Sequence, residues 1–170
     1  MQQILWIVDG NNLIHRDREL ARALEGGSLE AAKRLLEGEI ARFRARRGRG
    51  HSVLLVYDGA PPQGAPKACP KGLRILHPSR GGDADQVIVR EARRHEGRPD
   101  LGVRVVTSDR GDIALRLRGL QVAWYSIERF SPLLWEGREE GEPDGAPGGK
   151  PAPPRGSEVD FWLERFGGGE

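Results

Sequence analysis

Short apolar runs separated by amphipathic stretches dominate the first 136 residues of the chain. Three of these runs are rich in branched residues with almost no polar alternation, and they span residues 4–8, 53–57 and 103–106. Such runs are typical of strands that are covered on both faces in a parallel sheet. Weaker strand patterns cover residues 73–76 and 121–125. The pattern therefore predicts a mainly parallel sheet of up to five strands.

Helical periodicity fills the gaps between these runs. After Ser28, a candidate N-cap, apolar side chains recur at spacings of three and four as far as Phe43. Similar patterns predict further helices over residues 17–24, 87–95, 113–117 and 126–136. Because strands and helices alternate, we expect an α/β layer fold.

The composition changes sharply after residue 136, so residues 1–136 are predicted to form one domain. Residues 137–156 are rich in Gly and Pro and otherwise mostly charged or small, which predicts a disordered linker. In residues 157–170, Ser157 and Asp160 have the spacing of a capping box, and large aromatic side chains follow. We expect a short helical tail that docks either on its own domain or on a protein partner.

The composition also limits where the protein acts. No run approaches the ~20 apolar residues of a membrane span, and the start lacks the basic segment of a signal peptide. The single cysteine, Cys69, excludes an intramolecular disulfide and a cysteine-rich zinc site. A cytoplasmic protein with no membrane partner is the expectation.

Charge is distributed unevenly along the 170 residues. The net charge is +2 overall, but residues 1–136 carry +6 and residues 137–170 carry −4. A basic body favours a polyanionic partner. A generally soluble, arginine-rich surface is an equally simple interpretation.

Aspartates follow the predicted strands. Asp9, Asp58 and Asp109 come after the first, second and fourth runs, and Asp83 and Asp85 begin the helix that precedes the fourth. The carboxyl ends of parallel strands share one edge of a sheet, where ligands bind. If the strand order is 3-2-1-4-5, the first and fourth strands are neighbours, and Asp9 faces Asp109 across the point where the order reverses.

Clustered carboxylates repel one another unless a cation is present. Mg²⁺ and Mn²⁺ prefer oxygen ligands and can activate water beside a phosphate group. Each acid also has a structural interpretation, because Asp-Gly pairs form turns and Asp83, Asp85, Asp109 and Asp112 could cap helices. The chain contains no nucleotide-binding P-loop, serine-hydrolase elbow or zinc-protease motif. A metal site at the strand ends is therefore the leading hypothesis.

Three short segments carry a family resemblance. They are Asp9-Gly10-Asn11-Asn12 after the first strand, the helix start at residues 82–88, and the strand end at residues 105–109. In order and spacing they resemble the NYN branch of the PIN-like nucleases, and the YacP-like group in particular, over residues 2–135. Two positions depart from the usual pattern: Asn11 replaces an aromatic residue, and Asp83 stands where a small hydroxyl residue is common.

The resemblance implies a PIN-like three-layer α/β/α fold with a five-stranded, mainly parallel sheet in the order 3-2-1-4-5. It also implies a Mg²⁺- or Mn²⁺-dependent endoribonuclease that hydrolyses single-stranded RNA, which for some relatives is messenger RNA on the ribosome. By position, the implied catalytic residues are Asp9, Asn12, Asp85 and Asp109. The three aspartates among them would hold the metal, with Asp58, Asp83 and Asp112 in support.

Basic residues supply candidate RNA contacts, because cations that bind phosphates give affinity independent of sequence. Arg110 directly follows Asp109, and the loop before residue 73 and its flanks, which we expect beside the acidic edge, supply Lys67, Lys71 and Arg80. A third group, at the end of the long helix, comprises Arg44, Arg46, Arg47 and Arg49. This run is equally consistent with a solvated helix end.

Two other functions fit the same residues. One is an RNA-binding module of the same fold that does not cleave, although the acidic set is complete. The other is an α/β phosphatase acting on phosphomonoesters, which would require Asp-x-Asp after the first strand, where this chain has Asn11.

Overall fold

A computed structural model describes residues 3–61, 69–79, 82–108 and 111–138. The chain divides by its contacts into Met1–Gly137 and Arg138–Glu170. The predicted tail and all but the first two residues of the predicted linker lie outside the described residues.

One sheet of five parallel strands organises the described part, in the order β3-β2-β1-β4-β5. This confirms the predicted sheet and its strand order. The strands are β1 (Gln3–Asp9), β2 (His51–Val56), β3 (Leu73–Leu76), β4 (Leu101–Val106) and β5 (Val122–Tyr125).

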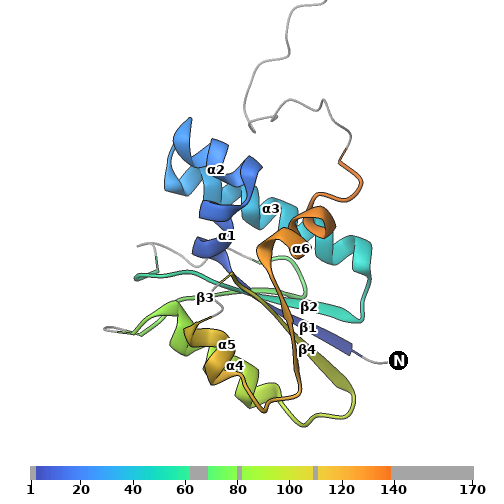
Figure 1. Ribbon diagram of the computed structural model, residues 1–170. Coiled ribbons are helices and arrows are strands. Elements are labelled where there is room, and N and C mark those ends of the chain that lie inside the picture. The colour runs from blue at the N-terminus through green and yellow to red at the C-terminus, as the bar shows by residue number, and fades with distance from the viewer. Residues whose placement is uncertain (1–2, 62–68, 80–81, 109–110, 139–170) are drawn as a thin grey trace, which may run out of the picture. The chain divides into compact units, whose positions relative to one another are not determined.

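Helices cover both faces of the sheet (Figure 1). One face packs against α1 (Gly10–Arg16), α2 (Arg18–Glu25), α3 (Leu29–Arg47) and α6 (Ile127–Leu134), and the other against α4 (Ala84–His95) and α5 (Asp112–Arg116). The predicted three-layer α/β/α architecture is thus confirmed.

Alternation along β1 explains why its apolar run is unbroken. Trp6 and Val8 enter the core on the α3 side, whereas Leu5 and Ile7 enter the core on the α4 side. All four side chains are buried, as expected for the central strand of a parallel sheet.

Helix α1 was not predicted. The sequence favours a turn after Asp9, yet residues 10–16 are helical, because the Asp9 carboxylate caps the helix and Leu13 and Ile14 bury their side chains beneath it. Ser28, in contrast, caps α3 as predicted, and its hydroxyl accepts a hydrogen bond from the backbone N–H of Ala31 at 3.2 Å. No helix in the described ranges is long and apolar enough to cross a membrane.

Candidate active site

Asp9 is held rigidly at the carboxyl end of β1. Its Oδ1 accepts a hydrogen bond from the backbone N–H of Asn12 at 3.0 Å, and its Oδ2 accepts one from the Thr107 hydroxyl at 3.3 Å. Only 5% of the residue is exposed. The strand end and the first turn of α1 therefore fix one carboxylate at the sheet edge where ligands bind in parallel α/β folds.

Asn12 joins α1 to the segment that follows β4. Its Nδ2 donates to the Thr107 hydroxyl at 3.3 Å, and its Oδ1 accepts from the Ser108 hydroxyl at 2.6 Å. These bonds are possible because β1 and β4 are neighbours in the sheet. Thr107 and Ser108 were not proposed as site residues, although they belong to the strand-end motif that precedes Asp109.

Burial dominates the electrostatics of Asp9. Removal from water raises the pKa of its carboxyl, the hydrogen bonds from Asn12 and Thr107 lower it again, and the nearby charge of Asp58 raises it further. The net effect is a raised pKa. A cation beside this carboxyl would oppose both effects that raise the pKa.

Asp58 connects the end of β2 to two helices. Its Oδ1 accepts a hydrogen bond from the backbone N–H of Ala84 at the start of α4, at 3.0 Å. Its own backbone N–H donates to Oδ1 of Asn11 in α1, at 3.4 Å. Asp58 is exposed and lies two residues beyond the strand. The structure thus brings Asp58, the start of α4 and Asp9 to the same edge.

The two acids of α4 differ in their surroundings. Asp83 is the N-cap, and its carboxylate accepts from the backbone N–H of Gln86 at 2.8 Å and from the Gln86 side-chain amide at 3.4 Å. Asp83 thus has the structural role that the sequence left open. Asp85 lies in the first turn of α4 and is half-buried.

Close packing explains the glycine after Asp9. A Cβ at Gly10 would lie 2.6 Å from Cε1 of Tyr57 and 3.0 Å from the backbone oxygen of Val56. Tyr57 is only 1% exposed, so its ring cannot swing into solvent to relieve the contact. Gly10 therefore allows α1 to begin directly against the end of β2.

Several predicted site residues lie outside the described part of the chain. They are Asp109, Arg110, Lys67 and Arg80, together with the side chain of Asp112. Within the described residues, no three or more His, Cys, Asp or Glu side chains form a group that could hold a metal ion. The oxygen donors that are described, Asp9, Asp58 and Asp85, are of the type that Mg²⁺ and Mn²⁺ prefer.

The predicted RNA-binding arginines at the end of α3 lie away from the acids. Arg44, Arg46, Arg47 and Arg49 lie at or just beyond the end of α3, before β2 begins at His51, so they flank the amino-terminal edge of the sheet. The acids follow the strands, at the opposite edge. Lys71 precedes Leu73, the first residue of β3, and so it also lies at the amino-terminal edge, not beside the acids as expected.

Three of these arginines form hydrogen bonds or ion pairs within the domain. The Arg44 Nε donates to the backbone oxygen of His51 at 3.2 Å, and Arg46 donates to the backbone oxygen of Leu134 at 2.7 Å. Arg47 forms an ion pair with Glu136 at 2.8 Å. They attach the end of α3 to β2 and to the end of α6.

Comparison with known proteins identifies the class. The model of the YacP-like NYN domain family matches residues 6–130, so the chain belongs to that family. Membership supports a nuclease-type function related to RNA. No curated protein matches the chain.

Two solved structures share the fold. The crystal structure of Rae1 (YacP) from Bacillus subtilis is 23% identical, with a TM-score of 0.62 over 79% of this chain and 74% of that one. The crystal structure of a single-substitution mutant of the same Bacillus subtilis protein is 20% identical, with a TM-score of 0.63 over 79% and 75% of the two chains.

Proposed function

We propose that the protein is a metal-dependent endoribonuclease that hydrolyses phosphodiester bonds in single-stranded RNA. The observation that carries the proposal is the buried Asp9 carboxylate at the carboxyl edge of a parallel sheet, oriented by Asn12 and Thr107. Family membership supports the nuclease class and an RNA substrate. The metal, the single-stranded substrate and the site residues are our inference.

Mg²⁺ or Mn²⁺ is the proposed cofactor, held by Asp9, Asp85 and Asp109, with Asp58 nearby. When bound, such an ion activates water and neutralises charge that develops on the phosphate. The residues of the chain prepare the site for this ligand. Thr107 and the backbone of Asn12 hold the Asp9 carboxylate in one orientation, and Asp58 ties β2 to the start of α4, which carries Asp85.

Asn12 has a separate proposed task. Its side-chain oxygen accepts from Ser108, the residue directly before Asp109, while its amide nitrogen donates to Thr107. Asn12 thus couples α1 to the chain immediately preceding a proposed metal ligand. We assign it a positioning role. Arg110, which follows Asp109, is the proposed phosphate contact at this edge.

Cleavage of a labelled single-stranded RNA in Mn²⁺ tests the proposal. The variants are Asp9→Asn and Asp109→Asn, and the matched control is Asp100→Asn, an exposed aspartate immediately before β4 at the opposite edge of the sheet. We expect internal cuts by the wild type and by Asp100→Asn. These cuts should disappear with a chelator and in both site variants.

Other results would contradict the proposal in distinguishable ways. Equal cutting by all variants would indicate a contaminant or a different site. Binding without cutting, for free RNA and for messenger RNA on translating ribosomes, would favour a non-cleaving RNA-binding module. Hydrolysis of a chromogenic phosphomonoester with RNA left intact would favour a phosphatase.

A further inference from the structure

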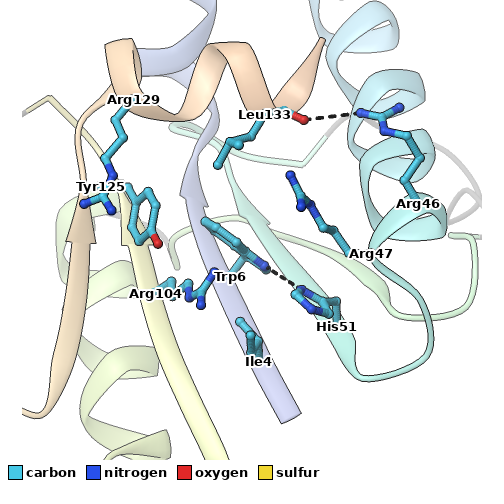
Figure 2. A pocket seen from close by; sticks show the side chains of 9 residues that line it. All are labelled: Ile4, Trp6, Arg46, Arg47, His51, Arg104, Tyr125, Arg129 and Leu133. Carbon is cyan, nitrogen blue, oxygen red and sulfur yellow. Dashed lines mark hydrogen bonds between the residues drawn. The ribbon is translucent and has the colours of Figure 1, made fainter. Parts of the chain in front are cut away.

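A concave site with no acidic residue in its lining lies on the α3 face of the sheet. It is a pocket of about 670 Å³ between the end of α3, helix α6 and strands β1, β2, β4 and β5. Its charged lining consists of four arginines and no carboxylate: Arg46, Arg47, Arg104 and Arg129. Figure 2 shows these side chains and His51 around Trp6.

Aromatic rings hold two of the arginines in place. The Arg104 guanidinium lies over the Trp6 ring, 4.8 Å from its centroid, and the Arg129 guanidinium lies over the Tyr125 ring at 4.2 Å. Neither arginine has a carboxylate partner among the described residues. Stacking uses the face of a guanidinium and leaves its N–H groups free to donate in the plane.

Arg47 adds a buried donor without a partner. Its terminal nitrogen pairs with Glu136, but its Nε is buried and has no hydrogen-bond acceptor in the described part of the chain. A buried polar group without a partner costs free energy until an acceptor satisfies it.

His51 presents a neutral ring to the same space. Its Nδ1 accepts a hydrogen bond from the Trp6 indole at 3.1 Å, which leaves the proton on Nε2. Burial lowers the pKa of His51, and the charges of Arg104 and Arg47 lower it further. The ring is therefore a neutral hydrogen-bond donor at neutral pH, surrounded by cations.

We propose that this pocket binds the phosphate groups of a nucleotide-sized ligand, supplied either by a free nucleotide or by an RNA strand. The Arg104 and Arg129 guanidinium groups both lie near the Tyr125 ring, 5.6 and 4.2 Å from its centroid, so their like charges repel one another. A phosphate relieves that repulsion because its oxygens can accept from both arginines at once. The volume exceeds that of a lone phosphate and falls within the usual range for small-molecule sites.

The pocket is a different site from the proposed catalytic edge, although Tyr125 in its lining borders that edge, because the backbone oxygen of Tyr125 accepts from the Thr107 N–H at 3.1 Å. Trp6 precedes Asp9 by three residues on β1, which corresponds to about 10 Å along a strand. Phosphate binding here does not require hydrolysis, so the inference stands or falls independently of the proposed nuclease activity.

Binding by the full chain, measured by calorimetry with a chelator present, tests the inference. The probes are ATP, pyrophosphate and a single-stranded RNA oligonucleotide. The test variant is Arg104→Gln combined with Arg129→Gln, and the control is Arg93→Gln, an exposed arginine on α4 at the other face of the sheet. We expect the double variant to bind at least one probe about tenfold or more weakly than both wild type and control.

The three probes distinguish a free nucleotide from an RNA strand as the source of the phosphate. Weaker binding of ATP and pyrophosphate identifies a nucleotide site. Loss confined to RNA, with the slope of log K against log salt reduced by about one for each arginine, identifies a strand-binding site. A perturbed His51 imidazole resonance on ligand addition supports either. No binding of any probe by the wild type, or equal binding by the double variant, overturns the inference.

Discussion

Replacement of Thr107 by Val tests whether the hydroxyl of Thr107 positions the candidate active site. Thr107 is fully buried, and Val keeps its shape while replacing the hydroxyl with a methyl group. The change removes the hydrogen bond to the Asp9 carboxylate and leaves the Asn12 amide without that acceptor. A hydrogen bond to a charged group contributes about 1.5–3 kcal/mol, so we expect the free energy of unfolding to fall by about 2 kcal/mol.

The same change should affect RNA cleavage. If the hydrogen bond from Thr107 orients Asp9, its loss should weaken transition-state stabilisation by about 1.4 kcal/mol, which lowers kcat/KM about tenfold. Urea unfolding and cleavage of labelled RNA measure the two effects separately. The cleavage assay is run well below the melting temperature of each variant, so that unfolding does not contribute.

Thr107→Ser is the matched control. It keeps the hydroxyl and removes one buried methyl group, which costs about 1 kcal/mol of stability. We expect this variant to cleave RNA at close to the wild-type rate. A Val variant that cleaves and unfolds like the wild type would refute the reasoning, as would a Ser variant that loses as much activity as the Val variant.

Three further predictions follow from the same geometry. Asp9→Asn should abolish cleavage yet unfold at equal or higher urea at pH 7 in a chelator. The pKa of Asp9 is raised in the native state, so the native state gains stability as pH falls and loses it as pH rises and the carboxyl ionises. Lower stability of the variant at every pH would contradict this prediction. Gly10→Ala should cost about 1–3 kcal/mol in urea unfolding because its methyl group has no room, whereas Gly38→Ala, with nothing within 4 Å, should stabilise α3 by about 0.5–1 kcal/mol. Asp17→Asn should lower the free energy of unfolding by about 2 kcal/mol, because the buried Asp17 carboxylate caps α2 and accepts from the Trp135 indole at 2.8 Å, and an amide would place a donor against that donor. In a double-mutant cycle with Trp135→Phe, the double variant should lose less stability than the sum of the two single losses.

The sequence was sufficient to predict the strands of the sheet. Strands β1, β2 and β4 are unbroken apolar runs because both faces of each are covered, and this burial leaves a direct mark on composition. The weaker runs at residues 73–76 and 121–125 are strands β3 and β5 at the sheet edges, where burial is less complete. Three short motifs sufficed to indicate the family, because their order and spacing are constrained by the fold.

Local preference misled the prediction in one place. Asn11 and Asn12 favour turns, but they lie in helix α1. The helix forms because Asp9 caps it and its apolar side chains are buried against the core, and this tertiary gain exceeds the intrinsic preference of two residues. The contacts of Asn12 with Thr107 and Ser108 join residues about a hundred positions apart, so no local pattern could have predicted them.

The sequence by itself determined which residues carry charge and where strands and helices alternate, because burial and periodicity are local properties of a chain. Only the tertiary structure decided which charges meet. The arginines that end α3 are neighbours of the acids in neither sequence nor space, since a helix leading into a parallel strand ends at the opposite edge of the sheet. Arg46 and Arg47 instead line a pocket with Arg104 and Arg129, because the strand order places β1, β4 and β5 side by side beneath the helices.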